Sequence, residues 1–156
     1  MSGAPEIRPL ARAHLPALLA LEARLFGADG WPRLMFLASL SPSFRSRVAV
    51  SGGAVIGFAR FGAGRLDKVL VRPEDQRRGV RSALLAAVLG AGPVTLEVAA
   101  GNPAREVYVR CGFVVTARLP GYYRPSGTDA LVMVRTGSGT PPAPPRPASP
   151  RRPVPW

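Results

Sequence analysis

An apolar strand that runs through a short polar loop directly into an apolar helix most constrains the fold of this chain. The strand ends at Val71, the loop contains Arg77, Arg78 and Gly79, and the helix continues to about Leu89. The first turn of a helix leaves backbone N–H groups unpaired and carries the positive end of the helix dipole. Gly79 lets a ligand approach the backbone closely, and the two arginines add positive charge. The segment therefore predicts a site for a phosphate or pyrophosphate group.

The length and composition indicate one folded domain. The chain has 156 residues, 47% of them hydrophobic, which suffices for a sizeable core. No apolar run is long enough for a transmembrane helix, and residues 1–6 do not resemble a signal peptide, so we expect a cytoplasmic protein without a membrane partner. One cysteine and one histidine exclude an internal disulfide and a Cys/His metal cluster.

The net charge of +12 raises the question of a nucleic-acid partner. Of the 21 lysine and arginine residues, 20 are arginine, and they are scattered along the chain rather than gathered on one helix face. Together with the many alanine, glycine and proline residues, this pattern is typical of a GC-rich coding bias. We therefore do not expect nucleic acid as a primary partner, but a basic surface attracts anionic coenzymes.

Hydrophobic periodicity predicts an α/β domain over residues 1–135. Strands are expected over residues 6–10, 47–50, 54–61, 66–71, 94–99, 113–119 and 130–135. Helices are expected over residues 11–26, 31–40, 80–89 and 101–110. Residues 136–156 are rich in proline and arginine and contain no acidic residue, so we expect a disordered tail there.

The polar loop resembles a known coenzyme signature. The segment Gln76–Arg81, with the sequence QRRGVR, is similar to the acetyl-CoA motif Gln/Arg-x-x-Gly-x-Gly/Ala of the GNAT N-acetyltransferases. Residues 95–98 (TLEV), followed by Asn102 and Tyr108, look like the second coenzyme segment of that family. Residues 121–123 (GYY) look like the ending of its RimI-type branch, which acetylates protein N-termini. The resemblance implies the GNAT fold, a mixed, mostly antiparallel sheet that is flanked by helices and splayed between strands 4 and 5.

The resemblance also implies where acetyl-CoA binds. Splayed strands leave backbone groups unpaired, and the amides of a pantetheine arm can pair with them. The implied coenzyme-binding residues are Val69, Leu70, Val71, Gln76, Arg77, Arg78, Gly79, Val80, Arg81, Ser82 and Asn102. Arg81 stands where the signature has glycine or alanine, and its side chain can either crowd the loop or reach a phosphate. Asn102 can equally be a cap at the end of a strand.

The resemblance assigns the acid–base chemistry to two residues, Glu97 and Tyr108. Glu97 matches the general base of the RimI-type enzymes, and the alternative is a structural carboxylate bonded to backbone N–H groups or to an arginine. Tyr108 matches the family acid that protonates the sulfur of CoA, and the alternative is an aromatic ring packed on the coenzyme. A phenol has an ordinary pKa near 10 and a thiol near 8.5, so this proton transfer is uphill by only ~2 kcal/mol. Trp31, Tyr122 and Tyr123 are expected to border the acceptor groove, unless they belong to the core.

The resemblance implies direct transfer of an acetyl group from acetyl-CoA to an amine, without a metal. We expect the acceptor to be a protein N-terminus, such as that of a ribosomal protein. An α-amine has a pKa near 8, against about 10.4 for lysine, so more of it is neutral at physiological pH. A GNAT enzyme for a small-molecule amine or lysine, and an acyl-CoA-binding module with little or no turnover, are the alternatives. A ribosome-associated or nucleic-acid-binding protein is a further alternative.

Overall fold

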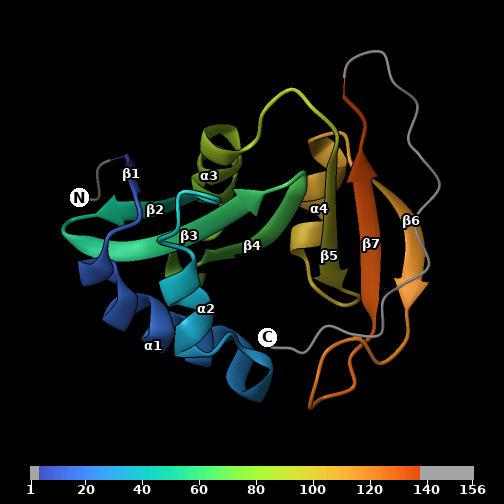
Figure 1. The fold of residues 1–156 in the computed structure, drawn as a ribbon, viewed down its shortest axis with the longest axis horizontal. Helices are drawn as coiled ribbons and strands as arrows, with labels where there is room; N and C mark the ends of the chain where they lie inside the picture. The colour runs from blue at the N-terminus through green and yellow to red at the C-terminus, as the bar shows by residue number, and fades with distance from the viewer. Residues whose placement is uncertain (1–3, 138–156) are drawn as a thin grey trace.

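Seven strands of residues 4–137, which the computed structural model describes, form one mixed sheet (Figure 1). The strand order is β1-β2-β3-β4-β5-β7-β6, and only the β4–β5 pair is parallel. The strands are β1 (Glu6–Pro9), β2 (Arg45–Ser51), β3 (Ala54–Gly62), β4 (Arg65–Val71), β5 (Val94–Ala99), β6 (Val114–Leu119) and β7 (Ala130–Arg135). This arrangement confirms the predicted mixed, mostly antiparallel sheet.

Helices pack on both faces of this sheet. They are α1 (Leu15–Phe26), α2 (Arg33–Ala38), α3 (Val80–Val88) and α4 (Ala104–Arg110). Short 3-10 turns are formed by Arg12–His14, Gly27–Asp29 and Pro73–Asp75. Helices α1 and α2 lie on one side of β2, β3 and β4, and α3 lies on the other (Figure 1). The sheet therefore separates α3 from α1 and α2.

Alternating residues of the central strands face two separate cores. On β2, Val48 and Val50 pack in the core with α1 and α2, whereas Ala49 packs in the core with α3 and α4. On β3, Phe58 and Ala59 divide in the same way. Successive side chains of a strand point to opposite faces, so an apolar run without polar interruptions is what a doubly covered sheet requires.

The sheet opens between β4 and β5. Their parallel pairing joins only Arg65 with Thr95 and Leu66 with Leu96. Beyond this point β4 continues beside β3 as far as Val71, and β5 continues beside β7. The backbone groups of β4 that face the gap therefore have no strand partner beyond Leu66. This geometry confirms the predicted splay and leaves one edge of β4 available to a ligand.

Several element boundaries differ from the prediction by one to four residues, and for two of them the structure shows a local reason. Strand β2 begins at Arg45 rather than Arg47, since Arg45 donates to the carbonyl of Val88 at 2.7 Å and Ser46 donates to that of Ser39 at 2.8 Å. Helix α2 is shorter than expected and begins only after Pro32, whose backbone is extended. The predicted disordered tail begins with two described residues that are neither helical nor stranded, and residues 138–156 lie outside the described part.

Within residues 4–137, no helix has the length and apolar character needed to cross a bilayer. A cytoplasmic location stays a prediction.

Candidate active site

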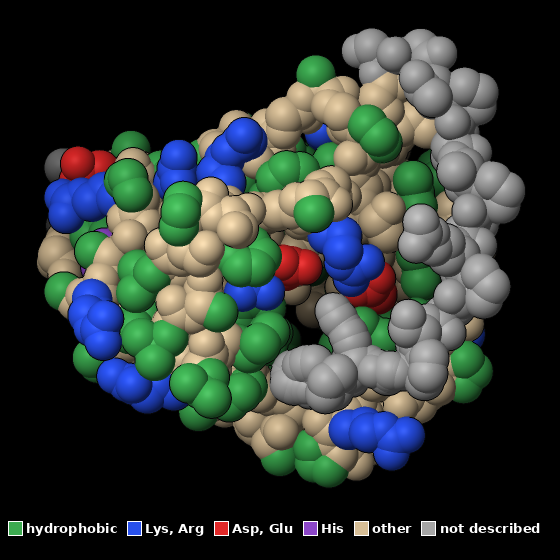
Figure 2. Space-filling model, viewed as in Figure 1, with side chains coloured by type: hydrophobic (Ala, Val, Ile, Leu, Met, Phe, Trp, Pro, Cys, Tyr) green, Lys and Arg blue, Asp and Glu red, His purple; other side chains and the backbone are tan. Residues whose placement is uncertain are grey.

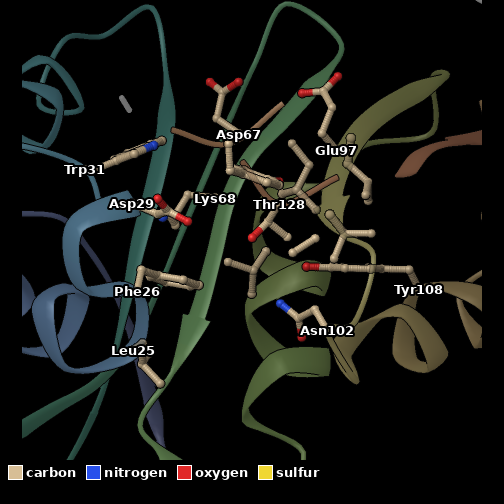
Figure 3. A pocket seen from close by; sticks show the side chains of 16 residues that line it. Leu25, Phe26, Asp29, Trp31, Asp67, Lys68, Glu97, Asn102, Tyr108 and Thr128 are labelled. Atoms are coloured by element: carbon tan, nitrogen blue, oxygen red, sulfur yellow. The ribbon is translucent and has the colours of Figure 1, made fainter. Parts of the chain in front are cut away.

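The splay between β4 and β5 holds a cavity of about 260 Å³, here called the splay pocket (Figure 3). Its walls come from the end of α1 and the turn after it, from β4, β5 and α4, and from the loop between β6 and β7. The lining residues are Leu25, Phe26, Asp29, Trp31, Leu66, Asp67, Lys68, Val69, Leu96, Glu97, Val98, Ala99, Asn102, Tyr108, Tyr123 and Thr128. On the face drawn in Figure 2, acidic side chains lie beside basic ones around a hollow.

Tyr108 forms the wall on the α4 side. Its side chain extends from α4 with the hydroxyl directed into the pocket (Figure 3), although only 5% of the residue is exposed. The ring packs edge-on against Phe113, with centroids 5.9 Å apart. Burial raises the pKa of Tyr108 above its ordinary value, and the charge and hydrogen bonding of Arg81 partly oppose this rise. The phenol is therefore protonated at physiological pH and can donate a proton.

Asn102 lies beside Tyr108 at the start of α4. Its Oδ1 accepts a hydrogen bond from the backbone N–H of Ala104 at 2.9 Å, so the side chain caps the turn that begins the helix. The same residue lines the splay pocket (Figure 3). The two alternatives for Asn102 are thus compatible, because a capping side chain can also border the ligand.

Glu97 lies at the opposite end of the pocket in an ionic network. Its Oε1 accepts hydrogen bonds from Arg65 Nη2 and, at 3.3 Å, from the hydroxyl of Tyr122. The Nε of Arg65 is also 3.6 Å from Asp67 Oδ1. Burial acts to lower the pKa of Arg65, but the neighbouring charges of Glu97 and Asp67 raise it overall. The arginine is therefore a permanent cation beside the carboxylate.

A buried ion pair supports the third wall, which is formed by the end of α1 and its aromatic neighbours. Lys68 Nζ donates to Glu22 Oε2 at 2.5 Å, and the backbone N–H of Trp31 donates to the same oxygen at 2.7 Å. The ammonium also lies 4.1 Å from the ring centroid of Phe26 and 4.9 Å from that of Trp31. Burial lowers the pKa of Lys68, although the charge of Glu22 acts in the opposite direction.

The predicted phosphate loop lies before α3, outside the lining of the pocket. Arg77 and Gly79 both adopt left-handed backbone conformations, with φ of +66° and +80°. Since Ala83 donates to the carbonyl of Gly79 to begin the helix, the N–H groups of residues 80–82 have no partner within it. Buried Asp75 holds Arg78 at 2.6 Å. Alternating left-handed residues and a helix N-terminus form a concave set of N–H groups that suits an anion.

Many of the predicted residues meet at the splay pocket. Its lining includes Trp31, Val69, Glu97, Asn102, Tyr108 and Tyr123. Tyr122 contacts the pocket through Glu97. Leu70 and Val71 are buried in the two cores, so only their backbone can face the splay.

Gln76 lies apart from the pocket, and its Nε2 donates to the carbonyl of Val71 at 3.2 Å. The side chain of Arg81 interacts with Tyr108. This contact differs from both alternatives expected for Arg81, which were crowding the loop and reaching a phosphate.

Sequence reasoning missed three side chains of β4 in the pocket region: Arg65, Asp67 and Lys68. A signal existed, because charged residues interrupt a strand that is otherwise apolar. Charges inside a central strand need partners, and such partners gather at functional sites.

The comparison with protein families decides the assignment. Residues 35–122, more than half of the chain, match the family described as the acetyltransferase (GNAT) domain. The chain belongs to this family. It is an acetyl-CoA-dependent N-acetyltransferase. No curated protein sequence matches it.

Solved structures of N-acetyltransferases share the fold. The ribosomal-protein-S18-alanine N-acetyltransferase from Escherichia coli is 25% identical, with a TM-score of 0.72 over 90% of this chain and 97% of that one. Ard1 from Thermoplasma volcanium is 27% identical, with a TM-score of 0.68 over 85% and 97%. Arabidopsis thaliana NAA60, solved with a bisubstrate analogue, is 21% identical, with a TM-score of 0.76 over 87% and 99%. In residues 4–137 of this chain, no group of three or more His, Cys, Asp or Glu side chains could hold a metal ion.

Proposed function

We propose that this GNAT enzyme acetylates the α-amine of a protein N-terminus, with Glu97 and Tyr108 at the two ends of the splay pocket. The observation that carries the proposal is their placement in one cavity beside the unpaired edge of β4. Val69, Leu70 and Val71 offer backbone groups to pantetheine, and the loop from Gln76 to Ser82 offers N–H groups to pyrophosphate. The opening between β4 and β5 is thus proposed to place the thioester of acetyl-CoA between Glu97 and Tyr108.

The two side chains have complementary tasks in the proposed reaction. As the amine nitrogen bonds to the acetyl carbon, it loses a proton to Glu97, directly or through a water molecule. As the carbon–sulfur bond breaks, Tyr108 donates its proton to the departing thiolate of CoA. Burial keeps the Tyr108 hydroxyl protonated by raising its pKa, and Arg81 limits this rise, so the hydroxyl can still donate its proton to the sulfur.

The acceptor is proposed to enter from the side of Trp31, Tyr122 and Tyr123. Asp29, after α1, accepts from the backbone N–H of Ser126 at 3.0 Å and also from its hydroxyl, which ties the β6–β7 loop to the α1–α2 turn. This bridge limits the width of the entrance, which supports an extended chain end rather than a folded surface. The likeness to the Escherichia coli enzyme, whose name states an N-terminal alanine substrate, supports the same acceptor class.

Acetyl transfer to matched peptides tests the proposal. One peptide has a free N-terminus and no lysine, the second has a blocked N-terminus and one lysine, and a polyamine serves as the third acceptor. We expect CoA release with the first acceptor only, and mass spectrometry is expected to place the acetyl group on its α-amine. Turnover restricted to the lysine peptide or the polyamine would contradict the N-terminal assignment. Saturable acetyl-CoA binding without turnover on any acceptor would instead indicate a binding module.

Replacing Gly79 by alanine is expected to weaken acetyl-CoA binding about fivefold. A side chain at φ +80° costs about 1 kcal/mol, and relief of this strain moves the N–H groups of the loop. Gly52 is a matched control, since it has φ +57° in the β2–β3 turn and, like Gly79, has no atom within 4 Å of an added Cβ. Calorimetric titration should show the loss of affinity for Gly79→Ala only. Equal affinities for the two variants would remove the loop from the coenzyme site.

A further inference from the structure

We propose that Arg65 is a positioning residue of the acetyl transfer, which holds Glu97 in place through Oε1 and leaves Oε2 to the acceptor amine. This inference rests on the proposed role of Glu97. It adds a residue that lies outside the coenzyme signature and that the resemblance does not indicate.

The contacts of Glu97 divide between its two oxygens. Two donors, Arg65 Nη2 and the Tyr122 hydroxyl, form hydrogen bonds with Oε1. Within residues 4–137, the side-chain hydrogen bonds of Glu97 are made through this oxygen and not through Oε2. The Glu97 side chain is 14% exposed and lines the pocket, so its second oxygen can accept a proton from a bound amine or from one bridging water.

The position of Arg65 in the sheet explains how it reaches Glu97. Arg65 begins β4 and pairs with Thr95, two residues before Glu97 on the parallel strand. One more pair, Leu66 with Leu96, follows before the splay begins, so the guanidinium bridges the two strands close to where they separate. A planar guanidinium holds a carboxylate in a fixed orientation, which a flexible ammonium does less well.

The charge of Arg65 is directed mainly at Glu97 rather than at its other acidic neighbour, Asp67. Facing Glu97 are Arg65 and Asp67 from β4 and Tyr122 from the β6–β7 loop. Arg60 of β3, bonded to Asp67 at 3.1 Å, balances that second carboxylate. Arg65 therefore acts mainly on Glu97, and its guanidinium fixes the orientation of that partly buried carboxylate.

Replacing Arg65 by methionine tests the inference. Without the guanidinium, Glu97 is no longer held in one orientation beside the acceptor, so kcat should fall roughly tenfold. The KM for acetyl-CoA should stay within about twofold, because the change acts at the carboxylate. Arg65→Lys keeps a donor and the charge, so it should restore part of the lost kcat. Arg8→Met is the matched control, since Arg8 is also a strand arginine paired with a carboxylate, on the distant strand β1.

A double-mutant cycle with Glu97→Gln separates positioning from a structural effect. If Arg65 acts through Glu97, Arg65→Met should have little further effect in the Glu97→Gln background. Equal losses in both backgrounds, or a loss that lies in the KM for acetyl-CoA rather than in kcat, would overturn the inference while the proposed function stands. Absence of turnover in the wild-type protein on every amine would instead refute the proposed function.

Discussion

Replacing Tyr108 by phenylalanine is expected to lower kcat roughly 10²- to 10³-fold and to leave acetyl-CoA affinity nearly unchanged. General acid catalysis is worth this much, and phenylalanine removes only the hydroxyl that points into the splay pocket. The ring contact with Phe113 is retained, so the thermal stability should change little. Steady-state CoA release and calorimetric titration of acetyl-CoA measure the two quantities. Unchanged turnover would remove Tyr108 as the acid.

A substitution of Arg81 provides a second test of Tyr108 as the general acid. Its charge lowers the pKa of Tyr108 against the larger effect of burial, so Arg81→Met should raise that pKa further. The phenol then becomes a weaker acid, and kcat is expected to fall while the KM for acetyl-CoA changes little. If Arg81 bound a phosphate instead, the KM would rise and kcat would hold. Tyr122→Phe, which alters a contact of Glu97 rather than the acid, should lower kcat less than Tyr108→Phe does.

The sequence predicts the elements well where local pattern decides them. The apolar runs of the central strands and the apolar helix after Gly79 are local features of the sequence, and the structure has both. The splay follows from the resemblance, because a gap between two strands leaves no mark in hydrophobic periodicity. The resemblance also identified Glu97 and Tyr108, which the structure brings to one pocket.

The ion pairs of the site lay beyond prediction for a physical reason. Arg65 and Glu97 are 32 residues apart, and Lys68 and Glu22 are 46 apart. Such partners are chosen by sheet register and helix packing, which no single-sequence pattern encodes. The contact between Arg81 and Tyr108 could not be predicted for the same reason, since it depends on where α4 places Tyr108. What the sequence could have indicated is that charges inside β4 require partners.

Replacing Lys68 by methionine is expected to destabilise the folded protein by about 3–5 kcal/mol. The substitution leaves the Glu22 carboxylate, only 1% exposed, without its cation, and Glu22 Oε1 already has no hydrogen-bond partner in the described residues. Breaking one half of a buried pair costs this much because a lone buried charge remains. Urea unfolding at pH 7 measures the loss, and a change below 1 kcal/mol would contradict it.

Lys68 and Glu22 are not equivalent members of the ion pair. Comparing their substitutions tests whether an unpaired buried charge explains the loss of stability. Glu22→Gln should cost less than Lys68→Met, because burial already lowers the pKa of Lys68 and the unpaired lysine can release its proton. As the pH rises toward the ordinary lysine pKa, the penalty for holding a charged, unpaired Lys68 disappears, so the Glu22→Gln deficit should shrink. The double variant Glu22→Gln/Lys68→Met should recover much of the stability that Lys68→Met loses, since no buried charge remains. Additive losses would show that packing against Phe26 and Trp31, rather than charge, makes Lys68 important.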